Sequence, residues 1–132
     1  KDVSFRPVFN TAITELFGLE IGTFGITEER AKKTGIEIAV GKFKGSTKPE
    51  YYPGGKSITV KVIFRKSDRK LVGAQIVGGE RIWGRITTLS ALAQKGATVE
   101  DVVYLETAYA PPVSPTIDPI SVAAEMALRR LH

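Results

Sequence analysis

Hydrophobic and polar residues alternate with a period of two along four separate stretches of the chain. This alternation places every second side chain on the same face of an extended backbone, so each stretch predicts a half-buried β-strand. Turn-forming residues such as Ser67-Asp68-Arg69 keep the connections short. Consecutive strands with short connections favour an antiparallel meander. The predicted strands cover residues 19–24, 36–43, 57–65 and 71–77.

Other stretches repeat their apolar residues at spacings of three and four, which is typical of a helix with one buried face. Start and stop signals support the short helix that begins at Thr27 and ends at Gly35, because acidic residues come first and basic residues last. Together, strands and helices predict an α+β domain, in which an antiparallel sheet of four or five strands has helices packed on one face. The predicted helices cover residues 8–17, 27–35, 80–94, 98–104 and 119–131.

A proline-rich segment precedes the last predicted helix. Residues 106–120 contain four of the seven prolines. Each proline fixes its own φ and pushes the preceding residue toward extended geometry, so Ala110 to Pro119 can form neither a helix nor a central strand. Asp118 is suited to the N-cap of the following helix, and Pro119 to its first position. We therefore expect a stiff, presented loop that the final helix anchors.

Length and composition indicate one folded domain. The 132 residues are 42% hydrophobic and 25% charged, which is ordinary for a globular domain and excludes a disordered chain. No apolar run approaches the length of a membrane span, and the N-terminus has neither the apolar core of a signal peptide nor an initiator Met. We expect a cytoplasmic protein without a membrane partner, and a chain that begins within a longer protein.

Several kinds of chemistry are excluded by the residues that the chain lacks. It has no cysteine, and its one histidine, His132, is terminal. Disulfides, thiolate metal sites, a thiol nucleophile and a histidine base are therefore unavailable in this segment. We expect no metal site and no self-contained catalysis.

The net charge of +5 permits attraction to phosphate-bearing partners. Lysine and arginine are nevertheless spread along the chain without a block of five or six, so a solvated basic surface is the favoured interpretation. The alternative is a freestanding small basic domain that binds nucleic acid or another anionic partner, with an affinity that falls steeply with salt. Self-association through apolar burial would depend little on salt.

Tyrosines are the candidate functional residues. Tyr109 lies in the proline-rich loop, where composition alone favours a ring packed beneath the prolines. The alternative is that the stiff backbone presents its phenolic hydroxyl as both donor and acceptor. Tyr51 and Tyr52 precede the turn-forming Pro53-Gly54-Gly55. Strand alternation would turn one of them inward and the other outward, so at most one is expected to be functional.

Trp83 lies off the apolar stripe of the helix predicted over residues 80–94. Packing in the core is the favoured interpretation. The alternative is an anchor in a protein interface, where tryptophan is enriched.

The proline-rich segment also resembles a known family. Its Ala-Tyr-Ala-Pro-Pro-x-Ser run at residues 108–114, followed by Asp118-Pro119, is similar to the signature near the C-terminus of the NADH oxidase and coenzyme A disulfide reductase branch of the pyridine nucleotide-disulfide oxidoreductases. Three further motifs occur in the same order as in that family: Asn10-Thr-Ala-Ile-Thr-Glu-Leu-Phe, Tyr51-Tyr52-Pro53-Gly54 and Leu71-Val-Gly-Ala-Gln-Ile-Val-Gly78. The resemblance implies that residues 8–132 are a C-terminal dimerisation, or interface, domain, and that residues 1–7 are a connector from a missing cofactor-binding domain.

The resemblance also implies a function. The parent would be a homodimeric flavoprotein that passes electrons from NAD(P)H through FAD to oxygen, a peroxide, or a disulfide or polysulfide. Tyr109, with Ala110 and Pro111, would reach the partner's flavin site in trans, and a second tyrosine would join it there, for which Tyr51 is a better match than Tyr52. The partners would be a second copy and the missing FAD and NAD(P)H domains of the same chain, with no nucleic acid; the fragment alone would bind neither cofactor and show no activity.

One position departs from the family pattern. Coenzyme A users of the family carry a lysine just before the Asp of the terminal motif, where this chain has Ile117. Isoleucine cannot offer an ammonium to a phosphate. Arg129 and Arg130 on the final helix could bind the substrate instead, although cations in a last helical turn are also explained by the helix dipole.

Overall fold

The computed structural model describes residues 3–4 and 6–132. Within this part of the chain, five strands form one antiparallel sheet in the order β1-β2-β5-β4-β3, which confirms the predicted α+β class. The connector predicted over residues 1–7 includes Lys1, Asp2 and Phe5, which lie outside the described residues. The elements are β1 (Ala12–Leu16), β2 (Leu19–Gly25), α1 (Glu28–Thr34), β3 (Ile38–Ser46), β4 (Ser57–Arg65), β5 (Leu71–Gly78), α2 (Ile82–Gln94), α3 (Val99–Val103) and α4 (Pro119–Arg129).

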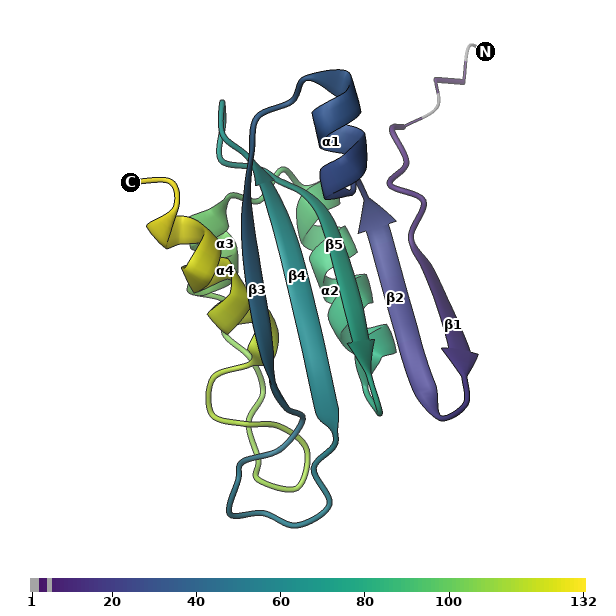
Figure 1. Ribbon diagram of the computed structural model, residues 1–132, viewed down its shortest axis with the longest axis vertical. Coiled ribbons are helices and arrows are strands. Elements are labelled where there is room, and N and C mark those ends of the chain that lie inside the picture. Colours follow the sequence, from purple (N-terminus) through teal and green to yellow (C-terminus); the bar gives the residue numbers. More distant parts are fainter. Residues whose placement is uncertain (1–2, 5) are drawn as a thin grey trace.

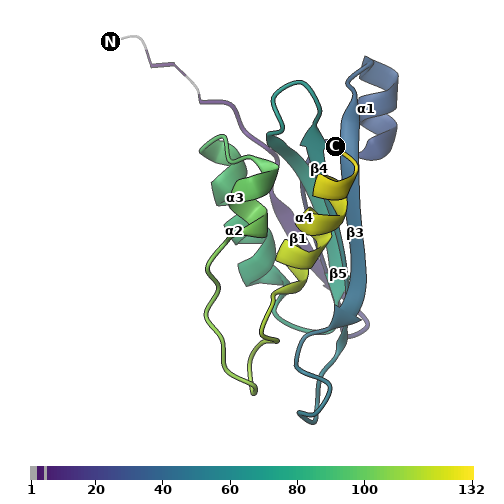
Figure 2. The same cartoon turned by 90° about the vertical axis from the view of Figure 1, so that its left-hand side faces the viewer.

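Three helices cover one face of the sheet, as predicted. Helices α2, α3 and α4 lie together on this face, whereas the short α1 lies on the opposite face at one end (Figure 1 and Figure 2). Alternation along β4 explains the two faces. Val60 and Val62 point into the helix-covered core, whereas Lys61 between them points the other way and binds Glu28 of α1 at 2.7 Å.

The core lies between the sheet and the three helices. Its largest fully buried side chains come mainly from β4, β5 and α2, and burial of each contributes about 1.5–3 kcal/mol to stability. Helix α4 approaches β3 so closely that a Cβ on Gly41 would lie 1.8 Å from the carbonyl oxygen of Ala123. Glycine is therefore required where these two backbones meet. The core members include Phe24, Ile58, Val60, Val62, Phe64, Ile76, Ile86, Leu89, Ala123 and Ala127.

The helix predicted over residues 8–17 is wrong. This region contains strand β1, which pairs with β2 from Ala12↔Thr23 to Leu16↔Leu19. Phe17 and Gly18 form the turn, both with positive φ, as a two-residue hairpin turn of type I′ requires. All five residues of β1 are exposed, so no apolar face was available to reveal the strand, and its backbone bonds to β2 decide the structure.

The predicted meander is correct for β3, β4 and β5 only. Strand β2 pairs with β5 rather than with β3, so the chain crosses through α1 to the far edge of the sheet. Strand β3 also continues beyond its predicted end at residue 43, because Gly45 pairs with Ile58 and Ser46 with Ser57. The sequence did not predict this crossover, because the helix over residues 27–35 was interpreted as part of a short connection between neighbouring strands.

Trp83 does not pack in the core. Its side chain is 64% exposed on α2, so the favoured interpretation of the sequence is wrong at this residue. Helix α2 begins only at Ile82, after Arg81 adopts a left-handed conformation with φ 58°. The buried face of α2 therefore includes Ile82 and Arg85 in its first turn, and Trp83 lies on the opposite, exposed face of the helix.

The two loops with candidate tyrosines lie at the same end of the sheet. The β3–β4 connection and the segment that precedes α4 both extend beyond the strands there (Figure 1). Residues 106–118 of the proline-rich segment contain no helix or strand, and Asp118 caps α4 by accepting a hydrogen bond from the Ile120 amide at 3.1 Å. We call this the tyrosine end of the sheet, and we call the end with α1 and the β4–β5 turn the far end.

Candidate functional site

Tyr51 and Tyr109 meet at the tyrosine end although 58 positions separate them in the chain. Their hydroxyl oxygens lie 3.0 Å apart, and either hydroxyl can donate. Both side chains are open to solvent, with 73% of Tyr51 and 45% of Tyr109 exposed. The structure therefore brings together two of the three tyrosines that the sequence singled out.

The loop that carries Tyr51 is closed at its base by Thr47. The Thr47 amide donates to the Lys56 carbonyl at 2.9 Å, and the Thr47 hydroxyl accepts from the Lys56 amide at 2.9 Å. Thr47 is fully buried, and its hydroxyl donates in turn to Glu80 at 2.6 Å. Gly54, with φ 84°, supplies the tight turn after Tyr52.

The loop that carries Tyr109 is held by a compact turn. The carbonyl of Ala110 accepts from the amides of Val113 and Ser114 at 2.9 and 3.0 Å. The buried Ser114 hydroxyl donates back to the Ala108 carbonyl at 3.0 Å. Tyr109 therefore lies between two anchored carbonyls, with the half-buried Ala110 and Pro111 beside it.

Tyr52 points elsewhere. Its ring is partly buried and lies under the ammonium of Lys48, which is 5.6 Å from the ring centroid, a cation–π distance. Tyr51 and Tyr52 lie in a turn rather than on a strand, so the alternation argument does not apply to them. A functional role for Tyr52 stays a prediction, but it is Tyr51 that contacts Tyr109.

The hydrogen bond between the tyrosines affects the pKa of Tyr51. The Tyr109 hydroxyl raises the pKa of Tyr51 above its ordinary value of 10.0, mainly through this hydrogen bond. Nearby, the pKa of Glu80 lies below its ordinary value, first because Thr47 donates to the carboxylate and further because Arg81 is close. Tyr51 is therefore neutral near pH 7, whereas Glu80 is ionised.

This pair can act as a hydrogen-bond donor. Two hydroxyls carry two protons, and their mutual hydrogen bond uses one of them. The second proton remains available for an acceptor outside this chain, and the first bond strengthens the second by polarisation. The site can thus stabilise an oxygen or sulfur that becomes negatively charged. Among residues 3–4 and 6–132, no group of three or more His, Cys, Asp or Glu side chains is placed to hold a metal ion.

Arg129 and Arg130 are not part of this site. They end helix α4, whose 11 residues extend about 16 Å from the tyrosine end toward the far end. Arg129 forms an exposed ion pair with Glu125 at 3.0 Å. Ile117 is exposed in the proline-rich loop. Substrate binding by the two arginines stays a prediction, and it would require a second point of contact.

Sequence reasoning missed the residues that hold the two loops. Glu80 binds Thr47, and Arg81 donates from its guanidinium to the carbonyls of Pro112 and Val113 in the proline-rich loop. Arg85, only 8% exposed, forms three side-chain hydrogen bonds with the carboxylate of Asp118 at 3.1–3.2 Å. These partners lie about 30 residues apart, and no spacing rule links them. An arginine on the buried side of a predicted helix was the one available signal.

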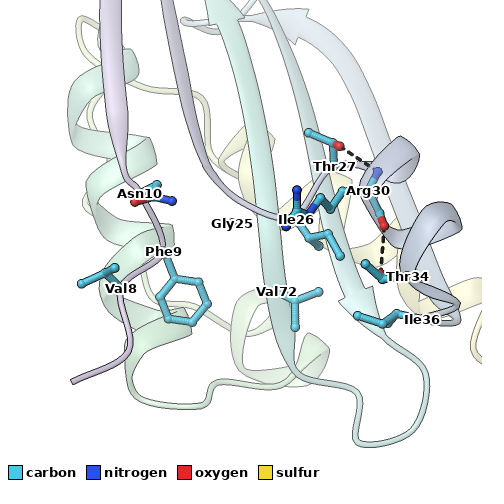
Figure 3. Close-up of a pocket in the computed structure, with 10 residues that line it drawn as sticks. All are labelled: Val8, Phe9, Asn10, Gly25, Ile26, Thr27, Arg30, Thr34, Ile36 and Val72. Carbon is cyan, nitrogen blue, oxygen red and sulfur yellow. Dashed lines mark hydrogen bonds between the residues drawn. The ribbon is translucent and has the colours of Figure 1, made fainter. Parts of the chain in front are cut away.

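A cavity of about 540 Å³ lies at the far end, away from the tyrosines. Val8, Phe9 and Asn10 line one side, and Thr27, Arg30 and Thr34 of the α1 region line the other (Figure 3). The two polar contacts drawn there satisfy the helix itself, since Thr27 caps α1 and Thr34 donates to the Arg30 carbonyl. No candidate site residue from the sequence lies in this cavity.

Most of the chain matches a known family. Residues 11–119 match the pyridine nucleotide-disulphide oxidoreductase, dimerisation domain. The chain belongs to this family. The resemblance based on the proline-rich signature is therefore confirmed, and no similar protein named below supports the nucleic-acid alternative. Among the described residues, no helix combines the length and the apolarity needed to cross a membrane.

Similar proteins contain this dimerisation domain as one part of a longer chain. An NADH oxidase of Methanocaldococcus jannaschii is 45% identical over 130 residues, which are 98% of this chain and 29% of that protein. A CoA-dependent NAD(P)H sulfur oxidoreductase of Pyrococcus furiosus is 40% identical over 96% of this chain and 28% of its own. The structure of an NAD-dependent persulfide reductase from A. fulgidus has a TM-score of 0.89 at 33% identity, over 96% of this chain and 24% of that chain. The chain thus spans less than a third of these relatives.

Proposed function

We propose that this dimerisation domain serves a homodimeric, FAD-dependent NAD(P)H oxidoreductase of the NADH oxidase or coenzyme A disulfide/polysulfide reductase type. The similar proteins support this assignment, because one is an NADH oxidase and another is a CoA-dependent NAD(P)H sulfur oxidoreductase. Residues 8–132 would form the domain, with residues 1–7 as its connector to the FAD and NAD(P)H domains. Such an enzyme would work in the cytoplasm.

The tyrosine pair would complete the partner's active site in trans. The main support is the 3.0 Å hydrogen bond between the hydroxyls of the exposed Tyr51 and Tyr109. This bond uses one of the two hydroxyl protons and leaves the other free for an acceptor outside this chain. Bound FAD would supply the electrons. The tyrosines would donate a hydrogen bond to the oxygen or sulfur that gains negative charge, and Ala110 and Pro111 would lie against the cofactor.

Heterodimers test the trans arrangement in the full-length protein. One subunit carries Tyr51→Phe and Tyr109→Phe with an intact redox centre, and the other keeps both tyrosines but has a substitution in its FAD domain that inactivates its own redox centre. If the tyrosines act in trans, the intact centre receives tyrosines from the other subunit and the heterodimer is active. If they act in cis, the heterodimer is as slow as the homodimer of the tyrosine variant, and the proposal is wrong.

A matched variant controls for loss of an exposed phenol. Tyr104 is also highly exposed, but it follows α3 and lies in neither of the two tyrosine loops. Tyr104→Phe should leave turnover at the level of the unmodified enzyme. An equal loss in Tyr104→Phe and Tyr109→Phe would mean that the tyrosine end has no special role.

Substrate binding by Arg129 and Arg130 forms a separate part of the proposal. They lie at the C-terminal end of α4, far from the tyrosines, so they would contact only a long anionic substrate such as coenzyme A. Replacing both by Gln should then raise KM for a coenzyme A disulfide without changing kcat. An unchanged KM would remove them from the site and leave the tyrosines unaffected.

A further inference from the structure

Glu80 and Arg81 lie between the two tyrosine loops. They are adjacent in sequence, in the short link from β5 to α2, and each contacts a different loop. Glu80 accepts from Thr47 at the base of the Tyr51 loop. Arg81 donates to the carbonyls of Pro112 and Val113 in the Tyr109 loop. One dipeptide thus joins two loops that share no other side-chain hydrogen bond among the described residues except that of the tyrosines themselves.

The contact of Glu80 with Thr47 is strong for its kind. It is charge-assisted and short, at 2.6 Å, and the Thr47 hydroxyl is fully buried. The same hydroxyl accepts from the Lys56 amide, so it connects the two ends of the Tyr51 loop to Glu80. Loss of the carboxylate would leave a buried donor without its partner.

The backbone at Arg81 is unusual in a way that favours a positioning role. Its φ of 58° lies in the left-handed region, which costs a non-glycine residue of order 1 kcal/mol. Glycine would adopt this conformation without strain. Arginine instead supplies a guanidinium that reaches the proline-rich loop, and its carbonyl accepts from Arg85 at 3.2 Å. Arg85 in turn binds the buried Asp118 at the end of that loop.

We propose that Glu80 and Arg81 are positioning residues that together set the separation between the Tyr51 and Tyr109 hydroxyls. Each residue holds one loop, and because they are adjacent in the chain, the two loops keep a fixed distance. The expected effect of these two residues on kcat rests on the proposed function. Its geometric part concerns this chain alone and can fail or succeed independently.

Dityrosine cross-linking tests the geometric part in the full-length protein. Photo-oxidation joins two phenols only when they are in contact, and peptide mass mapping identifies the product between Tyr51 and Tyr109. Tyr51→Phe sets the background. We expect Arg81→Gly to lower the yield roughly three- to tenfold, which is the range for losing one exposed charge-assisted hydrogen bond. We expect Thr47→Val to do the same through the other loop, and Arg81→Lys to restore part of the yield.

The chain offers a matched control at the far end. Arg69 also has a positive φ, of 63°, and its guanidinium binds a partner, Glu100. Arg69→Gly therefore repeats the loss of charge and the relief of strain without touching either tyrosine loop. It should leave the cross-link yield unchanged. An unchanged yield in Arg81→Gly, or an equal loss in Arg69→Gly, would overturn the proposal.

Kinetics separate this proposal from the proposed function. If both hold, Arg81→Gly lowers kcat with little change in KM for NAD(P)H, and Arg81→Lys recovers part of the loss. If the cross-link yield falls while kcat stays constant in Arg81→Gly and in Tyr109→Phe, the positioning role stands and the catalytic role of the tyrosines fails. If kcat falls in Tyr109→Phe while Arg81→Gly keeps the yield, the positioning role fails alone.

Discussion

The two ends of the sheet use the same kinds of residue in different ways. At the far end, Arg65 binds Asp68 within the β4–β5 turn, and Arg69 binds Glu100 of the adjacent α3. At the tyrosine end, Arg81 binds carbonyls of a loop without regular structure. Charges at the far end therefore support elements that backbone hydrogen bonds already hold. Charges at the tyrosine end instead join two loops that have internal hydrogen bonds but no regular structure, so substitutions there should change the geometry between the loops as well as stability.

The largest expected effect is that of Arg85→Ala at the tyrosine end. Removal of the guanidinium leaves the carboxylate of Asp118 buried without its ion pair, and we expect a loss of about 3 kcal/mol in the free energy of unfolding. Chemical denaturation measures it. Arg129→Ala is the control, since its ion pair with Glu125 is exposed and worth about 0.5 kcal/mol or less. Similar losses in the two variants would contradict the distinction between buried and exposed pairs.

Tyr109→Phe should have the next largest effect, and only on activity. The variant keeps the ring but removes one hydroxyl from the pair, so we expect kcat of the full-length enzyme to fall about tenfold or more. Stability should change little, because the hydroxyl is solvent-exposed. Steady-state kinetics beside thermal melts would check both statements. A fall in melting temperature together with kcat would indicate a structural role instead.

Acidification should affect both ends of the sheet. The pKa of Glu80 lies below its ordinary value of 4.5, chiefly because Thr47 donates to it. The pKa values of Asp68 and Glu100 are likewise lowered, chiefly by hydrogen bonds from Arg65 and Arg69. A carboxyl with a lowered folded pKa contributes its stability fully above the unfolded pKa, and the contribution is lost as the pH falls through the folded value. Stability should therefore decrease below about pH 4.5.

Glu80→Gln separates the two ends in this acid range. The amide oxygen can still accept from Thr47 but does not titrate, so we expect the variant to be less stable at pH 7 by on the order of 1 kcal/mol. The dityrosine yield between Tyr51 and Tyr109 should fall with acid in the unmodified protein and stay flat in the variant. Asp68→Asn at the far end is the control, and its dityrosine yield should still fall with acid. An acid-dependent yield that survives Glu80→Gln would assign the effect to another group.

Phe17→Asn should have the smallest effect. Phe17 lies at the tip of the β1–β2 hairpin with φ 51°, fully exposed, and asparagine tolerates this conformation better. We expect a gain of about 0.5 kcal/mol in the free energy of unfolding, measured by denaturation. The hairpin tip lies at the tyrosine end but contacts neither loop through a side-chain hydrogen bond within the described residues. A changed dityrosine yield would show that the hairpin also positions the loops.

The sequence predicted the strands and helices that have one buried and one exposed face. It did not predict the contacts between elements that are far apart in the chain. Strand β4 alternates clearly because Val60 and Val62 face the core and Lys61 does not. Strand β1 has no buried face, so its apolar residues produced a false helical period. The pairing of β2 with β5 depends on backbone bonds across 50 or so residues, for which side-chain patterns carry no information.

The candidate site divides in the same way. Tyr109 and Tyr51 could be selected because prolines and glycines marked their loops and because the family resemblance pointed to tyrosines of these motifs. A turn rather than a strand decides which tyrosine of the 51–52 pair meets Tyr109. Glu80 and Arg81 could not be selected, because a charged pair at a helix start is usually solvated. Only the folded arrangement shows that each contacts a different loop.

Helix α4 rests directly on the backbone of β3 at Gly41, with no side chain between them. The neighbouring core-facing positions on the strand, Ala39 and Phe43, carry side chains, so a shift of the helix along the strand would drive its backbone against a Cβ. Sliding is therefore blocked in both directions, and the helix, the sheet and Asp118 should move as one rigid body. Any adjustment that a bound partner demands must then come from rotation of the two phenol rings and from the loops that carry them.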